Sequence, residues 1–303
     1  MIKRKIFVIF CSMLLVLLTG SVAMAAGTTD WEGGFLQEDG YGVVPAGANS
    51  AGQARALARR AAIVDAYRNL AEYVQGVNVD AETTVRDLAV ESDVIQTKVS
   101  AVVKGARIVS EQMENDGTYH VVMQIPLYGV RSSLASAVLP ANPKPAAFPQ
   151  PEAVRPASSE GTVQPVPSAG GTTPQPAAGG SSAAPVPAGV NIQATGGYTG
   201  LVIDCRGLGL KPLMSPVIRN ANGTPIYGYK NLDSAAVIAN GMAGYASDMA
   251  RTTRAGSHPL VVSAQSLEGH QGNPVISVED ANRILVENQS SGFLDRCAVV
   301  FLR

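Results

Sequence analysis

The spacing of apolar side chains in the first third of the chain predicts two helices. Between residues 51 and 74 they recur at steps of three and four, which gathers them on one helix face. Asn49 or Ser50 can cap its start, and Gly76 is typical of a helix end. A second amphipathic helix is predicted for residues 91–104. The first stripe comprises Ile63, Tyr67, Leu70 and Val74, with Val64 and Ala71 beside it.

Strand patterns flank these helices. Residues 41–44 form a short predicted strand that ends at a proline. Residues 106–113 and 118–127 alternate apolar and polar side chains, the first imperfectly, around a turn at 114–117, whose Asp-Gly pair favours a β-hairpin. Helices that cover one face of such a sheet form an α+β domain, which we predict for residues 26–139.

A second set of helices and strands is predicted between residues 196 and 303. Asp233 or Ser234 can cap a helix that runs to about Arg251, and Ser277 can cap another that stops at Gly292. Short apolar runs predict strands, and a turn at residues 220–223 favours a hairpin. The alternation indicates a small α/β or α+β domain. The predicted strands are 199–205, 214–219, 225–229, 260–264 and 297–302.

The composition changes sharply between the two domains. Residues 140–195 contain twelve of the nineteen prolines, and Ala, Gly, Ser, Thr and Gln fill most of the rest. Such a segment buries too little apolar surface to offset the entropy of ordering it. We therefore predict two small domains joined by a disordered Pro/Ala/Gly-rich linker.

The N-terminus has the three parts of a secretory signal peptide. Lys3, Arg4 and Lys5 precede an apolar run of about 13 residues, which is shorter than the roughly 20 needed to span a membrane. Ala23-Met24-Ala25 supplies the small residues that signal peptidase requires, so we predict cleavage after Ala25. No later segment is long and apolar enough to span a membrane. The mature chain is thus expected in the periplasm or outside the cell, peripheral to the envelope.

Charge argues against a nucleic-acid partner. The whole chain carries a formal net charge of −1, and removal of the three basic residues in the signal leaves 20 basic against 24 acidic residues. Nucleic-acid binding usually requires a concentrated basic face.

Residues 31–127 resemble the lipoprotein-20 family of bacterial envelope proteins, whose fold is shared by the N-terminal domain of flagellar assembly protein T. The resemblance is carried by Gly40-Tyr41-Gly42, by the Ala/Arg-rich helix of residues 54–72 and by the hairpin. It implies a small α+β domain without known catalysis, near the outer membrane or the flagellar basal body. Members carry a lipidation cysteine just after the signal. Here the only signal cysteine is Cys11, which follows too few apolar residues and a bulky Phe10, so we expect no lipid anchor.

The mature chain has two cysteines, Cys205 and Cys297. An even number in an exported protein permits one disulfide, which would close a long loop and contribute roughly 4–5 kcal/mol. The alternative is two buried free thiols, each in an apolar strand.

No catalytic constellation is recognisable. The histidines lack metal-ligand spacing, the turn at residues 207–210 lacks the remaining signature of a phosphate loop, and nothing indicates that the acidic residues converge. We therefore expect no catalytic residue, metal or cofactor, and no enzyme. The histidines are His120, His258 and His270, and the acids considered are Asp204, Glu268, Glu279 and Asp280.

These observations favour a non-enzymatic envelope protein that assists or decorates an outer-membrane or flagellar basal-body assembly. Its first domain would bind a protein partner through a sheet edge or an arginine-rich helix face. One alternative is a periplasmic hydrolase or ligand-binding protein whose C-terminal site combines Asp204 with His258 or His270. Another is a module that binds peptidoglycan. The arginines of the proposed face are Arg55, Arg59, Arg60 and Arg68.

Overall fold

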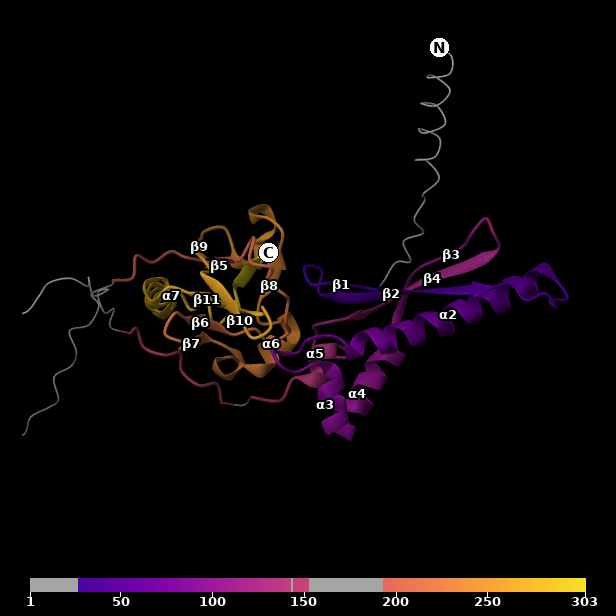
Figure 1. Cartoon of the computed structure of the whole chain (residues 1–303), viewed down its shortest axis with the longest axis horizontal. Coiled ribbons are helices and arrows are strands. Elements are labelled where there is room, and N and C mark those ends of the chain that lie inside the picture. Colours follow the sequence, from indigo (N-terminus) through magenta and orange to yellow (C-terminus); the bar gives the residue numbers. More distant parts are fainter. Residues whose placement is uncertain (1–26, 143, 153–192) are drawn as a thin grey trace, which may run out of the picture. The chain divides into compact units, whose positions relative to one another are not determined.

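The computed structural model describes residues 27–142, 144–152 and 193–303 (Figure 1). The signal peptide predicted for residues 1–25 and residues 153–192 of the predicted linker lie outside the described residues. The chain divides into two compact units by its internal contacts. The N-terminal unit comprises the residues up to Val77 together with Val85–Val138, and the C-terminal unit comprises Asn78–Thr84 and the residues from Leu139 onward.

The N-terminal unit is a four-stranded antiparallel sheet with helices packed beside it. Its elements are β1 (Thr28–Asp30), β2 (Phe35–Val43), α2 (Ala51–Gln75), α3 (Val85–Glu91), α4 (Asp93–Lys104), β3 (Arg107–Met113), β4 (Thr118–Pro126) and α5 (Leu134–Val138). The strand order is β1-β2-β4-β3. The long helix α2 lies along the sheet and packs on β2 and β4 (Figure 1), while α4 packs against α3 and α5. The hairpin predicted from the sequence is β3 and β4.

The predicted boundaries of α2 are confirmed. The Ser50 hydroxyl accepts a hydrogen bond from the backbone N of Gln53 at 3.2 Å, and the helix ends at Gly76. The second predicted helix is α4, which begins at a Ser92 cap. The sequence did not indicate α3, because seven residues make too few turns for a periodic apolar pattern to show.

Two glycines let α2 approach the sheet closely. A methyl group on Gly40 would overlap the backbone of Ala62 and Ala66, and one on Gly42 would overlap Ala58 and Ala62. The three alanines are fully buried and form one core cluster with side chains of β4. The Gly40-Tyr41-Gly42 motif thus has a packing reason: any side chain there would push the helix off the strand.

The C-terminal unit contains two four-stranded sheets. Its elements are β5 (Gly200–Asp204), β6 (Ile218–Asn220), β7 (Pro225–Tyr227), η1 (Tyr229–Asn231), α6 (Ser234–Asn240), β8 (Gly244–Ala246), η2 (Met249–Arg251), η3 (Thr253–Ala255), β9 (Pro259–Ser263), β10 (Ser266–Glu268), β11 (Asn273–Ile276), α7 (Val278–Ser291) and β12 (Val299–Leu302). One sheet is parallel, with the order β8-β12-β5-β9. The other is mixed, with the order β10-β11-β6-β7. The predicted fold class, two small domains that mix helices and strands, is confirmed.

The helix predicted from Asp233 or Ser234 to about Arg251 is wrong in its second half. α6 starts as expected, with Asp233 as its N-cap, but ends at Asn240. Gly241 has a φ of 77°, which a helix does not accommodate, and the chain turns there towards β8. Pairing of β8 with the buried strand β12 outweighs the local helix preference.

Both described ends of the predicted linker, residues 140–195, belong to the C-terminal unit. Asn282 on α7 accepts a hydrogen bond from the backbone N of Glu152 and donates to its carbonyl oxygen, at 2.8 and 2.7 Å. Glu287 on the same helix accepts a hydrogen bond from the backbone N of Thr195 at 2.8 Å. The predicted linker boundaries therefore move inward. Residues 152 and 195, on either side of the undescribed residues, both bind to α7.

Candidate functional site

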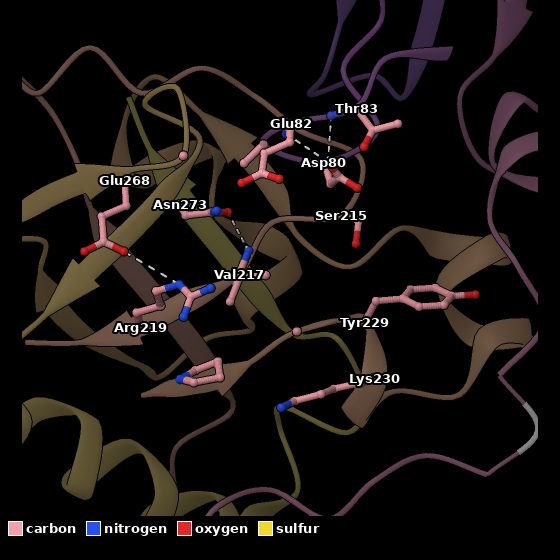
Figure 2. Close-up of a pocket in the computed structure, with 14 residues that line it drawn as sticks. Asp80, Glu82, Thr83, Ser215, Val217, Arg219, Tyr229, Lys230, Glu268 and Asn273 are labelled. Carbon is pink, nitrogen blue, oxygen red and sulfur yellow. Dashed lines mark hydrogen bonds and ion pairs between the residues drawn. The ribbon is translucent and has the colours of Figure 1, made fainter. Parts of the chain in front are cut away.

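A polar cavity of about 560 Å³ opens in the C-terminal unit (Figure 2). Small-molecule sites in proteins typically measure about 300–1,000 Å³. Five charged side chains line it: Asp80, Glu82, Arg219, Lys230 and Glu268. All of them belong to the C-terminal unit, so the cavity is complete within that unit.

One wall is the Asn78–Thr84 segment, closed into a loop by a bridge between its first and last residues. One oxygen of the Asp80 carboxylate accepts hydrogen bonds from the backbone N of Glu82 at 2.9 Å and of Thr83 at 2.8 Å. The backbone N of Ser215 donates to the same segment at 2.7 Å. These bonds hold the loop backbone beside the cavity and leave the Glu82 side chain free to face it.

Asn273, the first residue of β11, sets another part of the wall. It is 7% exposed, and its Oδ1 accepts a hydrogen bond from the backbone N of Val217 at 2.8 Å. Its Nδ2 donates to none of the described residues. Because buried amide groups normally find partners, this nitrogen is a donor available to a ligand.

Charges of both signs face the cavity. Arg219 Nη1 donates to the Gly223 carbonyl at 3.0 Å, and its Nε lies 3.6 Å from Glu268 Oε2. Within the described residues, neither the Glu82 carboxylate nor the Lys230 ammonium has a hydrogen-bond or ion-pair partner. Figure 2 shows these two side chains on opposite sides of the cavity. The arrangement offers both an anionic and a cationic contact.

The acids considered from the sequence do not converge. Asp204 ends β5 and pairs with Arg206 at 2.6 Å, a hydrogen-bonded contact that lowers the pKa of Asp204. Glu268 lines the cavity, whereas Glu279 and Asp280 lie in the first turn of α7. The sequence did not indicate Glu82 or Lys230, because nothing in their neighbourhood along the chain marks them as facing each other.

The histidines are also apart. His120 on β4 contacts the Asp39 carboxylate, in the N-terminal unit. His258 lies just before the first residue of β9, whereas Asp204 is the last residue of β5. Because β5 and β9 are parallel neighbours, the two residues lie at opposite ends of the strand pair. His270 Nδ1 lies 2.7 Å from the Ala81 carbonyl and does not line the cavity. The predicted alternative of a pocket that joins the strand-end acid to His258 or His270 is therefore not formed. Across the described part of the chain, no three His, Cys, Asp or Glu side chains are grouped to hold a metal ion.

The possible disulfide is contradicted, because Cys205 and Cys297 are free and buried. Their strands are neighbours but run parallel, with Asp204 opposite Leu302. Cys205 therefore follows one end of the pair while Cys297 precedes the other end. Six register positions separate them, about 20 Å at a rise of ~3.3 Å per residue. A disulfide needs Cα atoms roughly 4.4–6.8 Å apart.

The four arginines of the predicted binding face do not share one face of α2. At 100° per residue, Arg60 and Arg68 point about 140° and 220° away from Arg55. Arg59 is bound to Glu111 on β3 through Nε at 2.7 Å, and Arg68 pairs with Asp65 at 2.7 Å. The helix thus presents dispersed, partly neutralised charges rather than a basic patch.

The sheet edge of the N-terminal unit is the better candidate for partner binding. Among the described residues, β3 pairs only with β4, so its other edge carries unpaired backbone groups. Its side chains are exposed from Arg107 to Gln112, and Val109 is 50% exposed. A register shift lies between Ile108 and Ser110, which leaves Ser110–Met113 as the regular part of the edge.

The two units match two different families. Residues 44–126 match the LPP20 lipoprotein family, which confirms the resemblance seen in the helix and hairpin motifs. Residues 200–303 match the second domain of Treponema pallidum Tp0624. No curated protein matches the chain. The first match indicates an envelope-associated, lipoprotein-like protein, and no helix within the described ranges is long and apolar enough to cross a membrane.

Proposed function

We propose that this chain is an exported, non-enzymatic envelope protein that assists or decorates an assembly through protein contacts. The similarity of residues 44–126 to the LPP20 lipoprotein family supports the location at the cell envelope. The exposed β3 edge is the observation that carries the mode of action. Unpaired backbone groups on an edge strand are a template onto which a strand of another protein can add.

The proposal includes export by a signal peptide cleaved after Ala25, without lipidation. The sequence around Cys11 supports this, since it lacks the features of a lipidation site. The mature protein would then be held at the envelope by protein contacts, with peptidoglycan as a further possible contact. Mass spectrometry of the purified exported chain tests this point: an N-terminus at Ala26 without lipid is expected, and a lipid-modified cysteine would refute it.

The assembly is proposed to be at the outer membrane or the flagellar basal body. Deletion of the gene should cause detergent sensitivity in the first case and impaired swimming in the second. Normal swimming combined with detergent sensitivity would exclude the flagellar version. A deletion strain that is normal in both assays would contradict the assembly role as a whole.

The edge strand is tested by Val109→Lys, because a lysine on an edge strand disfavours strand addition. Val64→Lys is the matched control, since Val64 is also an exposed valine but lies on α2. We expect V64K to restore the deletion strain and V109K to fail, although both variants should fold. Full restoration by V109K would refute docking at this edge.

A second candidate function, ligand binding in the C-terminal unit, is supported by the cavity. Its walls bring together Glu82, Lys230 and the amide of Asn273, which are far apart in the sequence. Of the alternatives considered from the sequence, the geometry favours a ligand-binding protein over a hydrolase, because the expected acid and histidines are not assembled.

A further inference from the structure

We propose that the cavity of the C-terminal unit binds a zwitterionic ligand, namely a free amino acid or a short peptide with an unblocked ammonium and an unblocked carboxylate. The inference rests on the ligand-binding function proposed above and names its ligand class. It stands on charges of opposite sign that line one cavity, whose wall also contains the buried Asn273 with its amide donor.

The ligand carboxylate is matched by Lys230 and Arg219. The backbone of Lys230 is held in place, since its carbonyl accepts a hydrogen bond from the backbone N of Ala146 at 2.8 Å. Its ammonium makes no hydrogen bond or ion pair with the described residues. Arg219 uses Nη1 on the Gly223 carbonyl, which leaves Nη2 available. Cationic donors that line the same cavity suit a carboxylate.

The ligand ammonium is matched by Glu82 and Glu268. The backbone of Glu82 is fixed by the Asp80 carboxylate, so its side chain starts from a defined position. Glu268 lies 3.6 Å from Arg219 Nε and its side chain is 54% exposed, which makes that pair a weak one. An incoming ammonium can therefore contact both carboxylates at little cost.

Ligands with one charge or none fit this cavity less well. An anion would face three carboxylates, and a simple cation would face Arg219 and Lys230. An apolar ligand would remove water from Asn273 Nδ2 without replacing its hydrogen bond, which costs about 1–3 kcal/mol for a buried polar group. A zwitterion satisfies both charged walls and leaves a polar group for the amide.

The test is calorimetric titration of the mature chain, residues 26–303, with three probes. These are alanyl-alanine, its N-acetyl form, which lacks the ammonium, and its C-terminal amide, which lacks the carboxylate. We expect alanyl-alanine to bind at least tenfold more tightly than either blocked form, because each block removes one charge-assisted contact.

Two variants test which residue binds the carboxylate of the ligand and which binds its ammonium. Lys230→Met should weaken alanyl-alanine binding at least tenfold and change little for the C-terminal amide. Glu82→Gln should also weaken alanyl-alanine binding at least tenfold, and it should change the binding of the N-acetyl form little. Lys211→Met and Glu279→Gln are matched controls, since both residues are exposed and lie outside the cavity lining. They should bind all probes as the unaltered chain does.

The outcomes separate the two levels of the proposal. If all three probes bind with equal affinity and K230M or E82Q loses binding, the cavity is a ligand-binding site but the proposal of a zwitterionic ligand is refuted. Binding that both variants leave unchanged overturns the cavity as the site. No binding of any probe overturns both the ligand class and the ligand-binding function, while the β3 edge is tested separately by V109K.

Discussion

Glu38 makes the stability of the N-terminal unit dependent on pH. Its side chain is on the buried face of β2, whose residues alternate with more exposed ones along the strand, and it is only 6% exposed. Gly27 packs directly against its carboxyl group, with no room for a side chain between them. Burial and the neighbouring charge of Asp39 raise the pKa of Glu38 from 4.5 to about 7.

The sign of the effect follows from this shift. A pKa raised by folding means that the folded state favours the protonated carboxyl, so the contribution is complete below about pH 4.5. It is lost as the pH rises through about 7. With about 1.4 kcal/mol for each unit of pKa difference, the N-terminal unit should lose about 3 kcal/mol across this range. Glu38→Gln cannot ionise and should not suffer that loss.

The assay is urea unfolding of the mature chain at about pH 5, 6, 7 and 8. The chain has a single tryptophan, Trp31, and it lies in the N-terminal unit, so its fluorescence reports that unit. The difference in the free energy of unfolding between E38Q and the unaltered chain should grow by about 2.5 kcal/mol from pH 5 to pH 8, in favour of E38Q, since part of the whole effect falls below pH 5.

Glu72→Gln is the matched control, because it removes a carboxylate from an exposed position of α2. It should show the same pH dependence as the unaltered chain. If E38Q and the unaltered chain lose stability in parallel between pH 5 and 8, the raised pKa of Glu38 is refuted.

Three further predictions test the packing of the two units. Gly40→Ala should destabilise the N-terminal unit by about 3 kcal/mol in the same urea assay, because its methyl group overlaps the α2 backbone, whereas Gly47→Ala, with no atom within 4 Å of its new methyl, should not. After cleavage at a protease site inserted within 153–192, the two fragments should co-elute in gel filtration; Asn282→Ala should weaken that association because it removes both hydrogen bonds to Glu152, and separation of the unaltered fragments would refute those bonds to α7. Thiol labelling of the mature chain should modify two cysteines under denaturing conditions and neither when folded, and an absence of labelling in denaturant would restore the disulfide.

Elements with local signals could be predicted from the sequence alone. The cap at Ser50, the stop at Gly76 and the Asp-Gly turn of the β3–β4 hairpin act through hydrogen bonds between residues a few positions apart. The same holds for α7, which begins after Ser277 and ends where Gly292 takes a left-handed conformation. The alternation of helices and strands likewise determined the fold class, since amphipathic elements must bury one face against another.

Relations between distant residues were decided only by the tertiary structure. Cys205 and Cys297 were predicted on strand ends, but a single sequence does not show that the strands run parallel and so separate the thiols. The candidate site was missed for the same reason, because Glu82 and Lys230 meet at one cavity from distant parts of the chain. Such pairings depend on the free energy of the whole packed unit rather than on any local pattern, so they became visible only once the fold was known.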